Sequence, residues 1–449
     1  MNLSKKKSFI SKVLKWSLIY FKRYSNYIFN YGSPKNNIRF INDQSIVHLG
    51  NRSIQKKVFI NDRLFLKKIF SNNLKSISKF RNEKTAQKVF KHYNWFIPWT
   101  KKGLKSFTIP FYPTGSTLNK IGPQLERREQ LRIAGQVLQI ILDLHIAGYA
   151  HRDIKASNFL LVGDQVKLFD FEHLIKYPKN SKSRFSNHYD ITGKSLPPFL
   201  NCDSICFTSK ASDSVSSVLN VSLQEGYDEL QKILFRELSI TSCGFQNYRN
   251  VMREVVNHIY SSFDLGRFSV KPEDARRNTK IRFNQYKVTE EIIRDKKILN
   301  LGSCTGAINF EIYKFNPRKS IGIEYDYDKV EIAKKIAMFC DITNIKFLCG
   351  DLESMSIDKI GTGYDVVFCC AVEEHLKSPD RLFEIIGKVC NGLLFYEGTA
   401  SSDLSLEKRI ENTKRELSNV GFNSIEYLGQ CEDDHNPELN IRPLFRAYK

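Results

Sequence analysis

The stretch His151-Arg152-Asp153-Ile154-Lys155-Ala156-Ser157-Asn158 decides how the first half of this chain of 449 residues is interpreted. It follows a predicted helix over 128–147 and precedes a predicted strand over 165–169, which leads into Asp170. Asp153 can orient a hydroxyl group and accept its proton. Asn158 can hold a metal ion from the same loop, and Asp170 can hold one between the phosphates of a nucleotide. The spacing therefore predicts a site for phosphoryl transfer, with Asn158 and Asp170 as metal ligands.

Three further charged positions complete this predicted site. Lys155 can neutralise the transferred group, because it lies two residues after Asp153. Lys67 ends a predicted strand, and Glu83 lies on the predicted helix that follows it. An ion pair between Lys67 and Glu83 would fix the lysine on the phosphates of ATP. Lys68 competes for this role, but Lys67 fits the expected strand alternation better, so Lys67 is the prediction.

The elements around this loop predict an α+β fold of two lobes. Asn61-Asp62 is expected to form a tight turn between two strands, because both residue types tolerate the backbone of such turns. The apolar residues of the long helix recur at helical spacing. The expected elements are strands over 45–49, 54–60, 63–69 and 107–112, and helices over 78–92, 128–147, 222–238 and 246–262.

Residues 40–240 resemble the protein-kinase-like superfamily. The resemblance rests on the pattern H-R-D-x-x-x-x-N at 151–158, followed by Asp170-Phe171. It implies a bilobal α+β fold, binding of ATP and Mg2+, and phosphorylation of a hydroxyl group. A pseudokinase, which keeps the fold without turnover, is the alternative that the sequence leaves open.

Three departures from protein kinases affect the predicted acceptor. The expected phosphate-covering loop at 49–53 has one glycine, Gly50, instead of three. Glu172 stands where protein kinases have glycine, and no A-P-E-like segment can be assigned over 173–215. These features make the region more similar to lipopolysaccharide and sugar kinases. The residues 151–155 are nevertheless closest to Ser/Thr protein kinases, so a protein acceptor stays open.

A second motif, Leu299-Asn300-Leu301-Gly302-Ser303-Cys304-Thr305-Gly306, indicates a different chemistry. From Lys296 onward, predicted strands over 297–301, 320–325, 345–348, 365–370 and 392–396 alternate with helices, which predicts a doubly wound α/β domain. Gly302 and Gly306 allow a ligand to approach the backbone closely. Glu324 ends the second strand and can accept both hydroxyls of a ribose. Asp351, after the third strand, is placed for an adenine amino group.

These residues, over about 268–449, resemble the class I methyltransferases, which use S-adenosylmethionine. The resemblance implies that Asn300, Gly302, Gly306, Glu324 and Asp351 bind this cofactor, and that Glu374 and His375 lie beside the substrate. Asn300 replaces the usual acidic residue and Cys304 the usual middle glycine. A dinucleotide-binding dehydrogenase could share the first loop, and no metal is predicted in this domain. Arg276, Arg277 and Arg282 are expected on a solvated basic face.

The charge of the chain is concentrated at its beginning. The net charge is +21, and the first hundred residues carry 21 Lys and Arg but only 3 Asp and Glu. Residues 1–35 mix basic and aromatic residues, and their charges exclude a spanning helix. They are predicted to form an amphipathic helix on an anionic membrane surface. RNA, on whose bases the aromatic residues could stack, is the less favoured partner, because no RNA-binding motif is visible.

The sequence therefore predicts a basic amphipathic segment over 1–35, a kinase-like domain over 36–245, a helical linker over 246–280 and a methyltransferase domain over 281–449. The ten cysteines are expected to be reduced thiols of a cytoplasmic enzyme, with peripheral attachment to the inner face of the membrane. The domain content is similar to that of bacterial enzymes that cap surface-polysaccharide chains, although their methyltransferase comes first. We expect a glycan or lipid-linked saccharide as the acceptor.

Overall fold

The computed structural model describes residues 38–39, 46–49, 53–70, 74–176, 213–242, 259–400, 404–433 and 441–449. The predicted amphipathic segment over 1–35 lies outside the described residues. The chain divides into two compact units. Of the described residues, the first unit holds those up to Ile133, 147–176 and 213–222, and the second holds 134–146 and those from Leu223 onward.

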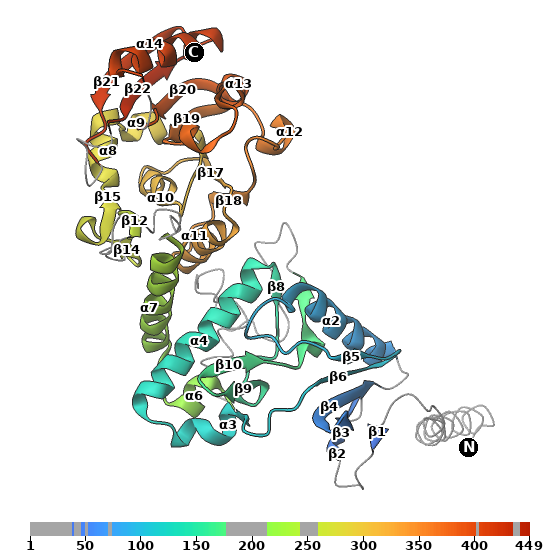
Figure 1. Cartoon of the computed structure of the whole chain (residues 1–449). Helices are drawn as coiled ribbons and strands as arrows, with labels where there is room; N and C mark the ends of the chain where they lie inside the picture. Colours follow the sequence, from blue (N-terminus) through green and yellow to red (C-terminus); the bar gives the residue numbers. More distant parts are fainter. Residues whose placement is uncertain are drawn as a thin grey trace, which may run out of the picture. The chain divides into compact units, whose positions relative to one another are not determined.

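The first unit begins with an antiparallel sheet that carries helix α2 (Leu74–Phe90) (Figure 1). Asn61 and Asp62 both have positive φ, at 50° and 59°, and join two eight-residue strands as predicted. The order is β1-β3-β4-β6-β5, with β2 paired to β3. The strands are β1 (Ile38–Arg39), β2 (Ile46–Leu49), β3 (Ser53–Ile60), β4 (Arg63–Phe70), β5 (Lys101–Lys102) and β6 (Ser106–Pro110).

The rest of the first unit positions the predicted phosphoryl-transfer loop. Residues 151–158 lie between β8 and β9, and Asp170 lies between β10 and the short 3-10 helix η5 (Phe171–His173). These elements form two small antiparallel sheets, of order β10-β9-β7 and β11-β8. They are β7 (Ser116–Thr117), β8 (Tyr149–Ala150), β9 (Phe159–Val162), β10 (Gln165–Leu168) and β11 (Ile175–Lys176), with α3 (Leu118–Ile121), the 3-10 helices η3 (Gly122–Gln124) and η4 (Ala156–Asn158), and α6 (Val215–Leu219).

The second unit contains the predicted doubly wound domain, so this prediction is confirmed. Its seven-stranded sheet has the order β18-β17-β16-β19-β20-β22-β21, in which β22 runs antiparallel to both neighbours and the other pairings are parallel. The strands are β16 (Lys297–Leu301), β17 (Lys319–Glu324), β18 (Ile345–Cys349), β19 (Tyr364–Cys370), β20 (Cys390–Glu397), β21 (Ser424–Gln430) and β22 (Pro443–Tyr448).

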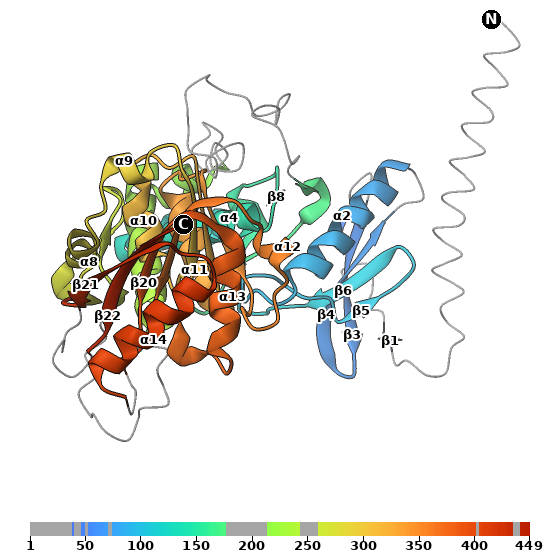
Figure 2. The ribbon, with the colours of Figure 1, turned by 90° about the horizontal axis from the view of Figure 1, so that it is seen from above.

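Helices cover this sheet and complete its core. Figure 2 shows α13 and α14 side by side. Apolar residues of the strands and of α13 form one continuous buried cluster, which excludes water from the sheet. The helices are α8 (Thr279–Tyr286), α9 (Glu290–Ile293), α10 (Ala307–Tyr313), α11 (Tyr327–Phe339), α12 (Ile357–Ile360), α13 (Pro379–Val389) and α14 (Leu406–Asn419), with the 3-10 helix η9 (Glu373–His375).

The predicted helical linker over 246–280 is wrong over 259–277, and residues 246–258 lie outside the described residues. Short strands replace the helix because Gly266, with φ of 74°, turns the chain and the flanking residues pair with each other. These elements are β12 (Ile259–Ser261), β13 (Phe263–Asp264), β14 (Ser269–Val270), the 3-10 helix η8 (Pro272–Asp274) and β15 (Ala275–Arg277).

Two helices that the sequence assigned to the kinase-like domain group with the second unit instead. They are the part of α4 (Arg127–Ile146) from Ala134 onward and α7 (Leu223–Ser242). The ammonium of Lys335, on α11, lies 3.3 Å from a carboxylate oxygen of Asp143 and 2.5 Å from one of Glu237. A buried ion pair therefore joins three helices of this unit. Among the residues described, no helix is both long and apolar enough to span a membrane.

Candidate functional sites

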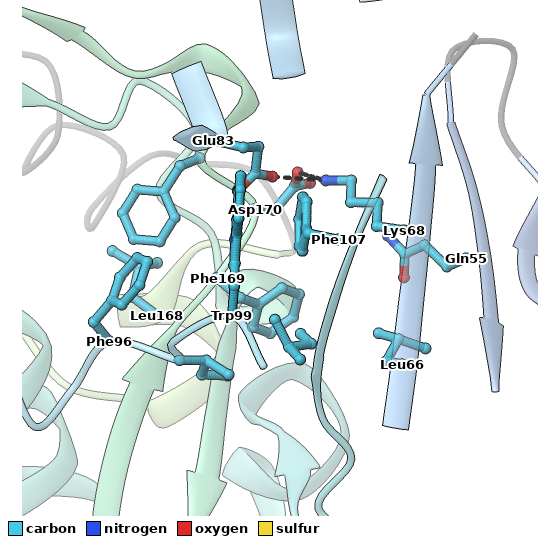
Figure 3. Close-up of a pocket in the computed structure, with 13 residues that line it drawn as sticks. Gln55, Leu66, Lys68, Glu83, Phe96, Trp99, Phe107, Leu168, Phe169 and Asp170 are labelled. Atoms are coloured by element: carbon cyan, nitrogen blue, oxygen red, sulfur yellow. Dashed lines mark hydrogen bonds and ion pairs between the residues drawn. The ribbon is translucent and has the colours of Figure 1, made fainter. Parts of the chain in front are cut away.

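One buried lysine of the first unit is surrounded by three carboxylates. The ammonium of Lys68, on β4, lies 2.9 Å from an oxygen of Glu83 and 2.6 Å from one of Asp170 (Figure 3). It also lies 2.9 Å from an oxygen of Glu172. Glu83 lies on α2, whereas the other two follow β10. This cluster therefore connects the sheet, its helix and the segment after the phosphoryl-transfer loop.

The prediction that Lys67 pairs with Glu83 is wrong, and Lys68 takes this role. Successive strand residues point to opposite faces, so only one of two neighbouring lysines can face α2. Leu66 and Lys68 share a face and both line the cleft. Burial lowers the pKa of Lys67, and the positive charges of Lys101 and Lys56 lower it further. No carboxylate contributes to this shift. Phe70 is buried, and residues two positions apart in a strand point to the same face, so Lys68 also lies on the inner face.

The charges of this cluster affect one another strongly. Burial opposes the charge of Lys68, but Glu83, Asp170 and Glu172 raise its pKa above the ordinary value. Burial raises the pKa of Glu83 to about 7, against the attraction of Lys68. Burial also opposes ionisation of Asp170, yet Lys68 holds the pKa of that carboxyl below its usual range. Glu83 is therefore the carboxyl of this cluster that takes up a proton near neutral pH.

The predicted loop brings Asp153, Lys155 and Asn158 together. One carboxylate oxygen of Asp153 lies 3.1 Å from the ammonium of Lys155 and accepts a hydrogen bond of 3.0 Å from the side-chain amide of Asn158. Burial works against ionisation, but Lys155 and these hydrogen bonds hold the pKa of Asp153 below its usual range. Asp170 helps to raise the pKa of Lys155. The predicted residues Asp153, Lys155, Asn158 and Asp170 therefore interact with one another through ion pairs, hydrogen bonds or charge.

Two features that hold this loop were missed by the sequence interpretation. Asp213 accepts a hydrogen bond of 2.6 Å from the hydroxyl of Ser157 and one of 3.2 Å from its backbone N–H. The carbonyl of Asp213 also accepts from the N–H of Ala156. Asp170 has φ of 69°, and the Phe171 ring stacks on that of Phe90. Asp213 lies just before α6, 55 residues after the loop, and nothing in the sequence around it indicated that it would hold the loop.

A cleft opens beside the Lys68 cluster. Figure 3 shows Lys68 and Asp170 at its polar end, with aromatic side chains around the remainder. The Trp99 ring stacks on the Phe107 ring with centroids 4.4 Å apart. The cleft therefore combines a flat apolar wall, which suits a nucleobase, with the charged groups that suit phosphates. It is lined by Gln55, Leu66, Lys68, Glu83, Phe96, Ile97, Trp99, Phe107, Ile109, Leu168, Phe169, Asp170 and Phe171.

In the second unit, Gly302 and Gly306 have the backbone that the sequence predicted. Their φ values are 67° and 91°, and a Cβ at Gly306 would lie 2.7 Å from the Phe347 ring. Cys304, between them, also has a positive φ of 49°. Its N–H donates a hydrogen bond of 2.8 Å to a carboxylate oxygen of Glu324. The loop after β16 and the end of β17 are thus fixed to each other at the carboxyl edge of the sheet.

Asn300 and Asp351 have structural partners in addition to their predicted roles. Asn300 is buried, and its amide donates a hydrogen bond of 2.7 Å to Asn309, which donates to Ser320 in turn. A carboxylate oxygen of Asp351 accepts from the N–H of Glu353 at 2.9 Å. The contacts of both residues with the cofactor stay predictions.

Glu374 and His375 follow β19, in the 3-10 helix η9. Glu374 accepts hydrogen bonds of 3.1 Å from the Thr399 hydroxyl and 3.0 Å from the Arg442 guanidinium. His375 lies 3.8 Å from Glu374, and about half of its side chain is exposed. Their contact with a substrate stays a prediction. Among the described residues, no cluster of three or more His, Cys, Asp or Glu side chains suits a metal ion.

The expected solvated basic face is wrong for Arg277 and Arg282, which are 1% and 4% exposed. Arg277 lies 2.9 Å from both Glu397 and Asp433, and Arg282 lies 3.3 Å and 2.7 Å from the same two acids. Two carboxylates thus neutralise two guanidiniums inside the domain. Glu397 ends β20, so this cluster fastens the segment before the domain to the carboxyl edge of the sheet. The acids lie more than 110 residues away, and nothing local indicated them.

The family comparison identifies the second unit. Residues 292–436, about a third of the chain, match the family model described as a methyltransferase domain. The chain therefore contains a methyltransferase domain, built on the doubly wound sheet described above.

Relatives that resemble the amino-terminal part are named as kinases. The leaf rust 10 disease-resistance locus receptor-like protein kinase-like 1.3 of Arabidopsis thaliana is 32% identical over 117 residues, which are 24% of this chain and 17% of the relative. The probable serine/threonine-protein kinase fhkA of Dictyostelium discoideum is 33% identical over 140 residues, or 28% of this chain and 23% of the relative. The chain thus spans less than a quarter of these relatives.

Solved structures show only distant similarity. EvdMO1 is 17% identical with a TM-score of 0.33, over 49% of this chain and 47% of that one. The YcgJ protein from Bacillus subtilis is 10% identical with a TM-score of 0.31, over 38% of this chain and 98% of that one. Similarity at this level does not by itself assign a fold, and the strand order and the family match carry the identification of the domain.

Proposed function

We propose that this chain is a bifunctional transferase, which phosphorylates a hydroxyl group with ATP and transfers a methyl group from S-adenosylmethionine. The methyltransferase half follows from the family match over 292–436. The phosphotransferase half rests on one observation. Lys68, Glu83 and Asp170 form a buried ion cluster beside a cleft, and Asp170 also acts electrostatically on the Asp153–Lys155 pair.

The loop after β16 fits S-adenosylmethionine. Gly302 and Gly306 have positive φ, and a Cβ at either position would lie within 3 Å of a neighbouring side chain, so this tight turn after β16 requires glycine. The carboxylate of Glu324 is fixed at the edge of the sheet and would hold the ribose hydroxyls, with Asp351 for the adenine amino group. The cofactor supplies the methyl group when bound. Glu374 and His375 would contact the methyl acceptor.

The cleft of the first unit fits ATP and Mg2+. Lys68 would bind the phosphates, since it is the buried cation at the polar end of the cleft. Asp170 and Asn158 would hold the metal ion, because the amide nitrogen of Asn158 is already bonded to Asp153 and its amide oxygen is the remaining ligand atom. Magnesium would supply neutralising charge at the phosphates.

The side chains of the loop have the charges that the transfer of a proton from a hydroxyl group needs. Asp153 is ionised, because Lys155 and Asn158 stabilise its carboxylate. It would orient the acceptor hydroxyl and accept its proton as the oxygen attacks phosphorus. Lys155, half-exposed beside it, would balance the negative charge of the transferred group.

We propose a glycan or lipid-linked saccharide as the acceptor, in cell-surface polysaccharide or lipopolysaccharide synthesis. Glu172 and the glycine-poor loop at 49–53, which depart from protein kinases, support this choice. The basic segment over 1–35 supports attachment to the inner, anionic face of the membrane. Phosphorylation followed by methylation of one saccharide end would explain why both domains occur in one chain.

A second candidate is a Ser/Thr protein kinase joined to the methyltransferase. The kinase relatives from Arabidopsis thaliana and Dictyostelium discoideum favour it. A pseudokinase beside an active methyltransferase is the third, and the complete set of Asp153, Asn158, Asp170 and the Lys68–Glu83 pair argues against it.

The test offers both acceptors to the full chain with Mg2+ and labelled ATP. Phosphate transfer to lipid-linked saccharide supports the proposal, and transfer only to protein supports the second candidate. Asp153→Asn should abolish either transfer while ATP binding persists, because it removes the proton acceptor and leaves the cleft intact. No transfer by the wild-type chain to either acceptor refutes phosphotransfer. Labelled S-adenosylmethionine, with Glu324→Ala as control, tests methylation separately.

A further inference from the structure

Glu172 connects four side chains that come from three different elements. One carboxylate oxygen lies 2.9 Å from the ammonium of Lys68 and 3.4 Å from the hydroxyl of Ser53. The other contacts the ammonium of Lys79. The backbone carbonyl of Glu172 accepts a hydrogen bond of 2.8 Å from the side-chain amide of Asn82. The glycine that protein kinases have at this position could accept only the last of these bonds.

These contacts fix the elements that form the nucleotide cleft. Ser53 begins β3 and is the last residue of the predicted phosphate-covering loop at 49–53, and Lys68 lies on β4. Lys79 and Asn82 lie on α2, one turn before and next to Glu83. Glu172 therefore holds the start of β3 and the helix α2 against the segment that carries Asp170.

The contacts of Glu172 are shielded from water. Only 9% of its side chain is exposed, and the Lys68 and Lys79 side chains that it contacts are 6% and 14% exposed.

We propose that Glu172 is a positioning residue for the proposed phosphotransferase and keeps its nucleotide site assembled without phosphorylation of the segment after Asp170. In regulated protein kinases, phosphorylation of that segment and movement of the corresponding helix control the Lys–Glu ion pair. Here a carboxylate within the segment binds both the lysine and the helix directly. The nucleotide site is therefore assembled at all times and needs no activating phosphorylation. This inference rests on the phosphotransferase half of the proposed function.

The experiment compares the full chain with its Glu172→Gln and Glu172→Gly variants, all treated with a phosphatase. Binding of a fluorescent Mg2+·ATP analogue is read by energy transfer from Trp99, which lines the cleft. Amide exchange of α2 and steady-state phosphotransfer are measured in parallel. Glu129→Gln, an exposed acid on α4, is the matched control.

We expect phosphatase-treated wild-type chain to be active. Glu172→Gly should lower kcat at least 10-fold and should also raise the Kd for the analogue, and Glu172→Gln should lie between. Amide exchange should become faster in α2 and stay unchanged in α14. Unchanged kcat and exchange in Glu172→Gly would overturn the inference, and a higher kcat would mean that Glu172 instead inhibits by sequestering Lys68. Loss of wild-type activity on phosphatase treatment would also overturn it. If the untreated wild type neither binds the analogue nor transfers phosphate, the proposed function itself fails.

Discussion

Replacing Lys68 by alanine should destabilise the first unit far more than replacing Lys67. Lys68→Ala leaves the carboxylates of Glu83, Asp170 and Glu172 together, with Lys79 as the nearby cation in contact with Glu172. Removing one partner of a buried ion pair costs about 3–5 kcal/mol, because the remaining charge is buried without compensation. That cost corresponds to a change of roughly 150- to 5,000-fold in the folding equilibrium.

The effect of Lys67→Ala should stay within about 0.5 kcal/mol, as for surface substitutions without a special contact. Its neighbours Lys56 and Lys101 already disfavour the charge of Lys67.

The loss of stability caused by Lys68→Ala should also depend on pH. With Lys68 present the pKa of Glu83 is about 7, so the wild type loses this proton by pH 8. Removing the lysine raises this pKa further, so the variant keeps the proton, and its penalty should be larger at pH 8 than at pH 5.5.

Unfolding of this unit can be followed by tryptophan fluorescence during urea denaturation. The three tryptophans of the chain are Trp16, Trp95 and Trp99, so none lies in the methyltransferase domain. Nucleotide binding by the same two variants gives a second measurement, in which only Lys68→Ala should lose affinity. If Lys67→Ala is at least as destabilising and binds nucleotide at least as poorly, the assignment of Lys68 to the cluster is refuted.

Three further predictions concern single groups. The pKa of Glu83 is raised from 4.5 to about 7, so its contribution to stability is complete below about pH 4.5 and is lost as the pH rises through 7. In the wild type, the free energy of unfolding should therefore fall by up to about 3 kcal/mol over this range. Glu83→Gln should remove this fall, as measured by urea denaturation at a series of pH values. Glu324→Ala should weaken S-adenosylmethionine at least 10-fold by calorimetry, and equal affinity would exclude its ribose role. Gly306→Ala should abolish cofactor binding, whereas Gly429→Ala, whose φ is also positive but whose Cβ meets nothing within 4 Å, should retain it.

Spacing along the chain predicted several of the groupings of residues that the structure shows. Asp153 and Asn158 are five residues apart in one loop, and the structure joins them by a hydrogen bond. Gly302 and Gly306 have the positive φ values that a tight turn after a strand requires. The alternation of strands and helices from Lys296 onward also gave the doubly wound sheet, because period and segment length are local properties.

The choice between Lys67 and Lys68 failed for a physical reason. Strand alternation separates two neighbouring residues only when the buried face is known, and β4 has partly buried side chains on both faces. The helical linker failed similarly, since the short strands over 259–277 are stabilised by pairing with each other. Propensity within such a segment cannot outweigh those tertiary contacts.

The two units share one physical limit on what a sequence can reveal. In each, residues beside a predicted site are held by charged partners more than a hundred positions away: Ser53 and Lys68 by Glu172, and Arg277 by Glu397. A buried charge is tolerated only where its partner is already in place, so these pairs fix the arrangement of elements as much as they contribute stability. Glu172 and Glu397 each follow or end a strand beside a predicted site. An acid at the carboxyl end of a strand, without a motif role of its own, is therefore the signal to examine for such a partner.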